Sequence, residues 1–383
     1  MKPFTRLASS AVLAVALVGV FAVPALADPS GGSHRGGGAD HVVFVQTDNT
    51  AGNQIVAYDR SDSGALTLAA TYDTQGLGGS LNGAVVDRTA SQGSLTYDAD
   101  HALLYAVNAG SNTVSVFSVT GDRLSLRQVI DSGGTFPVSV TVHGDLVYVL
   151  NALNGASVSG YRVAGDKLHR IEGSVRSLGL TIPTDNTQFT HTPGQIAISP
   201  DGAHLLVTTK ATTGAVDVFA VTPNGRVSDA PVVNTFAAGT VPFAISFDSL
   251  GHAVVADAGN NSVITSTINP DGTLTQIDSD ATSQAATCWI VRAGNRFYVS
   301  NAGSATLTGF QGDGTGQLSF IGNTATDAGT VDAAVSAQGD FVYVQAGAAG
   351  NVDGFRINND GTLTAVGSVT VPNAVGGEGI VAV

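Results

Sequence analysis

The chain has 383 residues, a formal net charge of −14 and 48 glycines, and only 12% of its residues are charged. A surface with this acidic excess repels nucleic acid and anionic lipid headgroups, which excludes nucleic-acid binding and attachment to membranes through basic patches. The single cysteine cannot form a disulfide within the chain, so strand packing must supply the stability.

The N-terminal segment has the pattern of an export signal. Lys2 and Arg6 precede an apolar run over residues 7–23, and Ala25-Leu26-Ala27 supplies the small residues of a cleavage site. We expect cleavage before Asp28 and a secreted, extracellular protein. A retained membrane anchor is the alternative, because the apolar run approaches the length that spans a bilayer.

Three segments with different roles are predicted. Residues 1–27 form the signal peptide, and residues 28–40 form a flexible leader, because they are rich in Gly and Ser and have nothing apolar to bury. Residues 41–383 form the folded domain.

The folded domain repeats one pattern. Residues 103–119, 297–310 and 341–357 read LLYAVNAGSNTVSVFSV, FYVSNAGSATLTGF and FVYVQAGAAGNVDGFRI. Each is an apolar strand, a turn of small and polar residues, and a second strand. A turn centred on Gly or Asp and a strand with leucine follow each of them, at 121–130, 270–279 and 359–368. A repeat of about 40–55 residues built from β-hairpins is typical of a β-propeller.

Seven such units fit the chain. A blade has four antiparallel strands, called a to d from the central axis outward. The b strands begin near Val42, Leu103, Leu146, His204, Ala253, Arg296 and Phe341. Candidate a strands lie near 94–98, 138–142, 194–199, 242–247, 287–292 and 330–335. We therefore predict an all-β fold, a seven-bladed β-propeller.

The C-terminal segment supplies the a strand that is still missing. Residues 379–383 read GIVAV, and we expect this strand to join the blade whose outer three strands begin the folded domain. The ring is then closed by the C-terminal strand in the N-terminal blade, which leaves no open end.

The loops differ between the two faces of the ring. The a–b and c–d turns, on what we call the turn face, are short and uniform. The d–a and b–c loops, on what we call the loop face, include two much longer segments, 74–93 and 175–193. Long loops on one rim of a rigid scaffold commonly carry function, so we predict the site on the loop face, where the a strands begin.

Two carboxylates are candidate catalytic groups at that rim. Glu378 and Asp332 could act as a general acid and base if enclosure raised a pKa. The alternative is a hydrogen-bonded pair that organises water in the channel. His191, in the second long loop, is the third catalytic candidate, because it could polarise a carbonyl.

Other rim residues are candidate ligand-binding groups, namely Gln92, Ser94, Ser139, Gln195, Cys288, Trp289 and Arg292. Trp289 either stacks on a ligand ring or caps the apolar floor of the channel. Cys288 is either a nucleophile or a buried inert thiol, and no activating base stands near it in sequence.

No motif for a metal or a cofactor is present. The remaining histidines of the domain, such as His101 and His252, fall at scattered turns and cannot converge on a metal. The Asp-Gly turns at 201–202, 271–272 and 360–361 lack the additional carboxylates of calcium loops. Nucleophile-elbow and phosphate-binding glycine motifs are absent. We predict no metal and no cofactor.

The segments SQGSLTYDADHALLYAVNAGSNTVSVF (91–117), PGQIAISPDG (193–202), PFAISF (242–247) and ATCWIV (286–291) carry a family resemblance. Together they resemble the secreted lactonase-like seven-bladed propellers, relatives of 6-phosphogluconolactonase and of the carboxymuconate cyclases. The resemblance covers residues 41–383 and implies a lactonase-like hydrolase. The anionic substrates of those relatives require a cluster of cationic side chains, which this rim lacks, so the expected lactone is neutral.

Two functions are compatible with the sequence. One is a secreted hydrolase of a neutral lactone or sugar-derived ester. The other is a non-catalytic extracellular scaffold that binds a ligand or a protein through the same rim. The expected partners are a small-molecule or carbohydrate-like ligand and a cell-envelope protein, with neither nucleic acid nor, after signal cleavage, a membrane.

Overall fold

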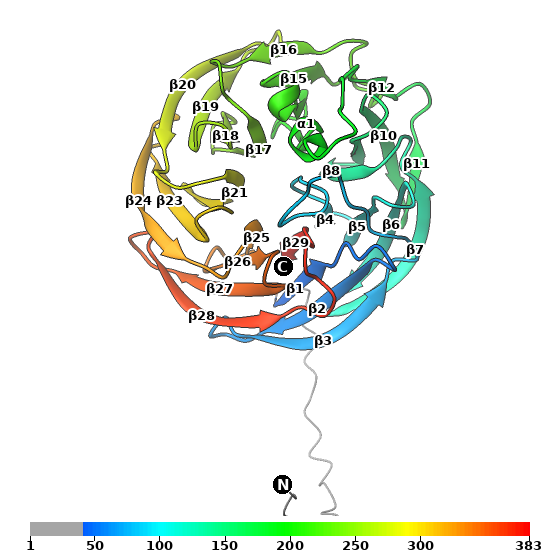
Figure 1. Ribbon diagram of the computed structural model, residues 1–383. Helices are drawn as coiled ribbons and strands as arrows, with labels where there is room; N and C mark the ends of the chain where they lie inside the picture. The colour runs from blue at the N-terminus through cyan, green and yellow to red at the C-terminus, as the bar shows by residue number, and fades with distance from the viewer. Residues whose placement is uncertain (1–40) are drawn as a thin grey trace, which may run out of the picture. The chain divides into compact units, whose positions relative to one another are not determined.

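Seven antiparallel sheets, six of four strands and one of five, surround a common axis in residues 41–383, the part of the chain that this computed structural model describes (Figure 1). The expected signal peptide and leader lie outside the described residues. Within each sheet the strands follow one another from the axis outward, so that sequence neighbours are also neighbours in space.

The first four blades are named in chain order, and the strands of each run from the axis outward. Blade one contains β29 (Ile380–Ala382), β1 (Val42–Gln46), β2 (Gln54–Arg60) and β3 (Leu66–Asp73). Blade two contains β4 (Leu95–Asp98), β5 (Leu103–Asn108), β6 (Thr113–Thr120) and β7 (Arg123–Asp131). Blade three contains β8 (Pro137–His143), β9 (Leu146–Asn151), β10 (Ser157–Ala164) and β11 (Lys167–Arg170), and β12 (Arg176–Ser177) also pairs with β10. Blade four contains β13 (Ile196–Ile198), β14 (His204–Thr208), β15 (Ala215–Ala220) and β16 (Val232–Thr235).

The last three blades are regular. Blade five contains β17 (Pro242–Phe247), β18 (Ala253–Asp257), β19 (Ser262–Ile268) and β20 (Leu274–Ala281). Blade six contains β21 (Thr287–Ala293), β22 (Arg296–Asn301), β23 (Thr306–Gly312) and β24 (Leu318–Ala325). Blade seven contains β25 (Thr330–Val335), β26 (Phe341–Ala346), β27 (Asn351–Ile357) and β28 (Leu363–Thr370). Two helical turns interrupt residues 41–383, α1 (Gln188–His191) and the 3-10 helix η1 (Lys210–Thr212).

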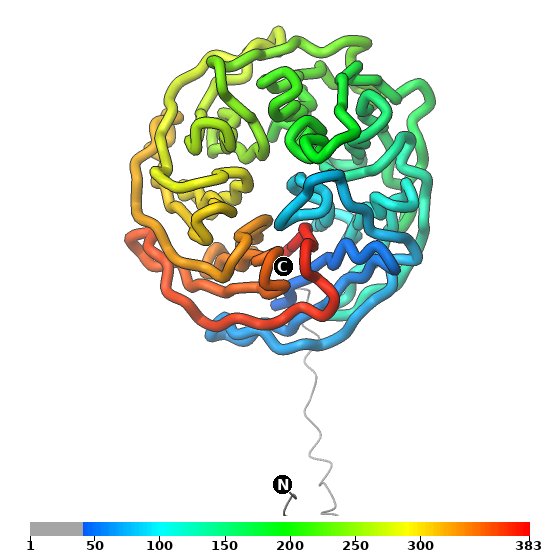
Figure 2. The backbone as a smooth tube through the Cα atoms, in the orientation of Figure 1, coloured from blue at the N-terminus to red at the C-terminus, as the bar shows by residue number. Residues whose placement is uncertain are grey.

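The first and last strands close the ring as predicted. β29 pairs antiparallel with β1, with Phe44 opposite Val381. The backbone atoms of Val42 and Val383 exchange hydrogen bonds of 3.1 and 2.9 Å. Figure 2 shows the two ends of the folded chain, blue and red, meeting in one blade. All seven b strands begin at the predicted residues, so the fold prediction is confirmed.

The hydrophobic core lies between the blades. A blade is a sheet, and each of its faces buries side chains against the next blade. Phe44 and Ala57 of blade one, for example, pack with Leu104 and Phe117 of blade two. Burial of apolar surface between blades is the main stabilising contribution, at roughly 25 cal/mol per Å².

Tyrosine–glycine pairs tie some blades together. Tyr148, Tyr298 and Tyr343 each stand opposite a glycine of the c strand, which leaves room for the ring. Their hydroxyls donate to backbone oxygens in the c–d turn of the following blade, at distances of 3.0, 2.9 and 2.7 Å. The equivalent positions in blades four and five hold Leu206 and Val254, which have no hydroxyl.

Candidate functional site

The loop before β4 closes the axis at the loop face. Gln92 is its central residue. The backbone oxygen of Gln92 accepts a hydrogen bond from the Ser139 hydroxyl (2.7 Å), and its backbone N–H donates to Gly194 (3.1 Å). Its side-chain amide pairs with both backbone groups of Ile290 at 2.9 Å each. Blades three, four and six therefore meet at one residue of this loop.

The second long loop packs against the first. Asn82 accepts a backbone hydrogen bond from Phe189 (3.3 Å), and its own N–H donates to the side-chain oxygen of Gln188 (3.0 Å). Its side-chain amide donates to the backbone oxygen of Thr184 (2.9 Å). We call residues 81–93 the cover. Its path depends on contacts with segments far away in the sequence.

Lys210 fastens both long loops to blade four. Its Nζ donates to the backbone oxygens of Ala90 (2.7 Å) and Phe189 (2.5 Å) and to the hydroxyl of Thr192 (3.0 Å). The same Nζ lies 5.2 Å from the centre of the Phe243 ring, a cation–π contact. These contacts satisfy every N–H of the ammonium, so Lys210 is a structural tie.

Burial changes the ionisation of Lys210. Because water no longer solvates the ammonium, its pKa falls from 10.5 to about 7, although the nearby Asp87 carboxylate favours the charged form. Cys288 lies close enough to interact electrostatically with the same ammonium.

Trp289 holds the cover rather than facing an open pocket. Its indole N–H donates to the backbone oxygen of Ser91 at 2.6 Å, and its ring centroid is 4.8 Å from that of Phe243. Only 3% of Trp289 is exposed. Burial raises the pKa of the neighbouring Cys288 thiol to about 12, which fits a buried inert thiol and not a nucleophile.

Glu378 lies directly beneath the cover. It precedes β29 and has no exposed surface. Its Oε1 accepts a 2.8 Å hydrogen bond from the backbone N–H of Gly93. Its Oε2 is 3.5 Å from the Thr89 hydroxyl and 3.4 Å from the Ser91 hydroxyl. The glutamate therefore binds three residues of the cover.

Asp332 joins Glu378 as the second carboxyl group of a pair. It stands in β25 where the register with β26 shifts between Thr330 and Ala333, and this β-bulge redirects the side chain. Asp332 is hydrogen-bonded to the Glu378 carboxyl group and is 3% exposed. The sequence pattern placed these two residues at one rim, and the structure brings them into contact.

Two further buried carboxylates surround the pair. Asp48 accepts a 2.8 Å hydrogen bond from the backbone N–H of Glu378 and a 2.6 Å bond from the Gln46 side chain. Asp87, in the cover, accepts backbone hydrogen bonds from Thr89 and Ser91, each 2.8 Å long. Four acidic side chains therefore lie together out of contact with water.

Their enclosure raises all four pKa values. Burial is the largest cause for each of the four, and repulsion between carboxylates adds to it for Asp48, Asp332 and Glu378. The pKa of Glu378 is raised well above its usual value, and those of Asp332 and Asp48 rise to about 7. The pKa of Asp87 is also raised. Burial and like-charge repulsion therefore both favour the protonated forms of the Asp332–Glu378 pair.

Asp48 and Asp87 are the two members of this group that were not among the predicted site residues. Asp48 is the second residue after the b strand of blade one, and Lys210 occupies the same position after the b strand of blade four. The other blades have small residues there: Ala109, Ala152, Ala258, Ala302 and Gly347. Asp48 and Lys210 also both have φ of 48°, a sparsely populated conformation for such residues. A strict alignment of the repeats would have identified both.

The remaining candidates lie around the pair or away from it. The Ser94 hydroxyl donates to the backbone oxygen of Glu378 (2.8 Å), and the side-chain oxygen of Gln195 accepts from the N–H of Ile245 (2.6 Å). The ring of His191 is hydrogen-bonded to the backbone of its own helix, at Thr187. Arg292 donates to Gly294 near the turn face. His191 and Arg292 make no hydrogen bond to the carboxyl pair in residues 41–383.

Metal and membrane features are absent from the described part of the chain. In residues 41–383, no three His, Cys, Asp or Glu side chains are arranged to hold a metal ion. Within the same residues, neither helical segment is long and apolar enough to cross a bilayer.

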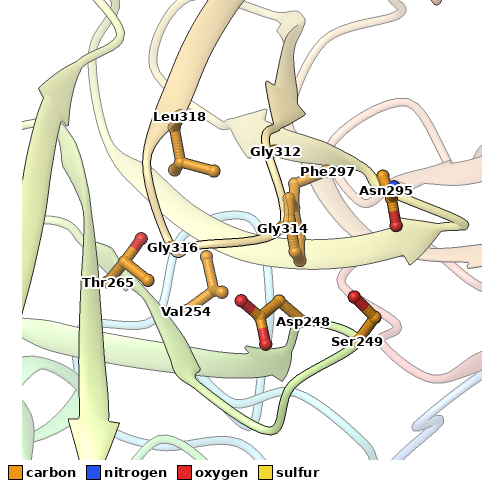
Figure 3. A pocket seen from close by; sticks show the side chains of 10 residues that line it. All are labelled: Asp248, Ser249, Val254, Thr265, Asn295, Phe297, Gly312, Gly314, Gly316 and Leu318. Atoms are coloured by element: carbon orange, nitrogen blue, oxygen red, sulfur yellow. The ribbon is translucent and has the colours of Figure 1, made fainter.

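Two cavities lie at the turn face, away from the carboxyl pair, and another of about 340 Å³ lies at the loop face, lined by residues 211–214 and 235–241. One of the two turn-face cavities is a narrow space of about 10 Å³ between blades five and six, lined by Asp248, Ser249, Phe297 and seven other residues (Figure 3). Val254, which replaces the interblade tyrosine of other blades, is among them. A larger cavity, of about 590 Å³, lies between blades four and five.

The comparison with known families identifies the fold family. A model described as the seven-bladed β-propeller lactonase family matches residues 85–377. The chain belongs to this family. A search of curated proteins finds no match.

Solved structures of similar fold include members with lactonase names. A candidate 6-phosphogluconolactonase from Bacteroides uniformis has a TM-score of 0.72 and 18% identity, with 88% of this chain and 98% of that chain covered. The periplasmic gluconolactonase PpgL of Pseudomonas aeruginosa has a TM-score of 0.67 and 17% identity, with 89% and 98% covered. At such low identity these likenesses establish the propeller fold and leave activity open.

Proposed function

We propose that this lactonase-family propeller is a secreted hydrolase of a neutral lactone or sugar-derived ester. The observation that carries the proposal is the Asp332–Glu378 pair, two buried, hydrogen-bonded carboxyl groups whose pKa values are both raised, that of Asp332 to about 7, as suits proton transfer. Family membership supports the reaction class.

In the proposed reaction, one carboxylate of the pair takes a proton from water as the water oxygen attacks the lactone carbonyl carbon. The protonated partner then gives its proton to the ring oxygen as the C–O bond breaks, which yields a hydroxy acid. The backbone N–H of Gly93, which now binds Glu378, is a donor available to a substrate oxygen once the cover moves.

The cover must move for turnover. Glu378 is fully buried, so substrate can reach it only when residues 89–93 separate from blade six. The hydrogen bonds that this motion breaks include those of Trp289 with Ser91, Gln92 with Ile290 and Lys210 with Ala90. A closing segment of this kind excludes water during reaction.

The charges near the pair favour a neutral substrate. Lys210 uses its three N–H groups within the protein, and Arg88 donates to the backbone oxygen of Asp48 at 3.0 Å. Four buried carboxylates would repel a phosphate or a carboxylate substrate. The N-terminal signal pattern supports secretion, and PpgL of Pseudomonas aeruginosa is named as a periplasmic gluconolactonase.

The enclosure of Glu378 also favours a second candidate, a non-catalytic scaffold that binds a ligand or a cell-envelope protein. In that case the carboxyl pair serves only to fasten the cover. The two candidates differ in whether a lactone is opened.

The test is alkali uptake at constant pH by the purified protein with a panel of neutral and phosphorylated lactones. The matched variants are Glu378→Gln, which keeps the shape and removes the acid, and the exposed control Glu172→Gln. We expect turnover of a neutral lactone by the wild type and Glu172→Gln, and its loss in Glu378→Gln. No turnover of any lactone, or an active Glu378→Gln, would refute the hydrolase and leave the scaffold.

A further inference from the structure

The cavity of about 590 Å³ between blades four and five has the size of a small-molecule site. It opens at the turn face, on the far side of the ring from the carboxyl pair. Its walls come from the a–b turns of both blades and the c–d turn of blade five: Ser199, Pro200, Asp201, Ala203, His204, Ala220, Ser249, Leu250, Gly251, Ile268 and Pro270.

His204 is an unpaired polar group at this cavity. It begins β14 and is 7% exposed, and its backbone N–H donates to the Ser199 hydroxyl. Its imidazole makes no hydrogen bond within residues 41–383. The ring lines the cavity, so a ligand there can supply a hydrogen-bond partner to it.

Carboxylates give the cavity a negative character. One oxygen of Asp201 accepts from the Ser199 hydroxyl (2.5 Å) and from the backbone N–H of Ala203 (3.0 Å), and these bonds lower the pKa of Asp201. Its other oxygen accepts no hydrogen bond from the described residues. Asp271 also lies close enough to interact electrostatically with His204. No Lys or Arg lines the cavity.

The opposite wall is apolar. Leu250, Ile268 and Pro270 of blade five line it, and Leu250 is 67% exposed, which is unusual for a large aliphatic side chain. Blade four also lacks the tyrosine that ties blade three to blade four, because Leu206 stands in its place. The hydroxyl contact to the c–d turn of the next blade is therefore missing at this interface.

We propose that this cavity is a binding site for a small organic cation, an amine or ammonium group on an apolar body. The free oxygen of Asp201 binds the cation, the His204 ring accepts or donates a hydrogen bond, and the proline–leucine wall covers the apolar part. This set of lining residues disfavours organic anions, because no Lys or Arg side chain lines the cavity. The site is independent of the lactonase proposal.

The test is calorimetric titration of the purified protein with three probes of similar shape: phenethylamine, 2-phenylethanol and 3-phenylpropionate. The key variant is Asp201→Asn, because asparagine keeps the turn hydrogen bond from Ala203 and removes the charge. The matched control is Asp360→Asn, which removes one charge from an Asp-Gly turn of blade seven.

We expect the amine to bind more tightly than the alcohol, and the acid not to bind. Asp201→Asn should weaken amine binding about tenfold, the order expected for loss of one charge-assisted hydrogen bond, whereas Asp360→Asn should not change it. Leu250→Ala should weaken the amine and the alcohol alike. No amine binding, equal binding of the three probes, or equal effects of the two Asp variants would overturn the proposal. Unchanged melting temperatures would show that the variants are folded.

Discussion

The ammonium of Lys210 lies 2.7 Å from the backbone oxygen of Ala90, 120 residues earlier in the chain, and this bond ties the cover to blade four. The same ammonium binds Phe189 in the other long loop. One buried charge therefore holds both segments that close the loop face.

Replacing Lys210 with methionine should loosen the cover. The backbone oxygens of Ala90 and Phe189 lose their donor, and each such loss costs about 1–3 kcal/mol. We expect amide hydrogen exchange over residues 84–93 to become about tenfold faster or more. The control is Lys167→Met, at an exposed lysine of β11. Equal rates of amide hydrogen exchange over residues 84–93 in the two variants would contradict the role of Lys210 in holding the cover.

Stability should fall as pH rises from 5 to 8. The pKa values of Asp332 and Asp48 are about 7 in the folded protein and about 4 when unfolded, so the folded state binds more protons between these values. The contribution of these two carboxyl groups to the free energy of unfolding is therefore complete below pH 4 and is lost as pH rises through 7. Lys210 acts in the opposite direction above pH 7, where its folded form loses a proton that the unfolded form keeps.

Glu378→Gln should flatten that pH dependence, because it removes one of the repelling groups and keeps an oxygen that can accept from Gly93. At pH 8 we expect it to raise the free energy of unfolding, because burial and the neighbouring carboxylates raise the pKa of Glu378 well above its usual value. Denaturant unfolding at pH 5 and pH 8 measures both effects, with Asp313→Asn on an exposed turn as the control. A steeper dependence in Glu378→Gln would be incompatible with a buried, repelling carboxyl group.

Trp289→Phe should destabilise the cover while keeping the aromatic packing on Phe243. The backbone oxygen of Ser91 loses the indole N–H, at a cost of about 1–3 kcal/mol. Urea unfolding compares this variant with Phe320→Leu, at an exposed ring of β24. If Trp289→Phe lowered the free energy of unfolding no more than Phe320→Leu does, the hydrogen bond from Trp289 to Ser91 would contribute nothing to stability.

Cys288 should be unreactive in the native protein. Its thiol is buried and its pKa is raised to about 12, so almost no thiolate is present at pH 8. Iodoacetamide should label the native protein very slowly and should label the single cysteine fully after unfolding in urea. Rapid labelling of the native form would restore Cys288 as a reactive group.

The repeat pattern was enough to predict the blades, because the apolar residues of each strand indicate that the strand is buried. It also placed Asp332 and Glu378 at one rim, since both stand at the start of an a strand. Whether that rim is open or covered could not be predicted in the same way. It depends on where residues 81–93 run, and the contacts that fix them, such as Trp289 with Ser91 and Gln92 with Ile290, join positions 198 residues apart.

The most direct test of the carboxyl pair is the pH dependence of kcat/KM for the best neutral lactone of the panel, in the wild type, Asp332→Asn and Glu378→Gln. We predict a wild-type profile with a limb near pH 7, where Asp332 titrates, and a loss of about 100-fold or more in each variant, as removal of a general acid or base gives. Variants that keep the wild-type rate and the same limb would contradict the assignment of the pair as the acid and base.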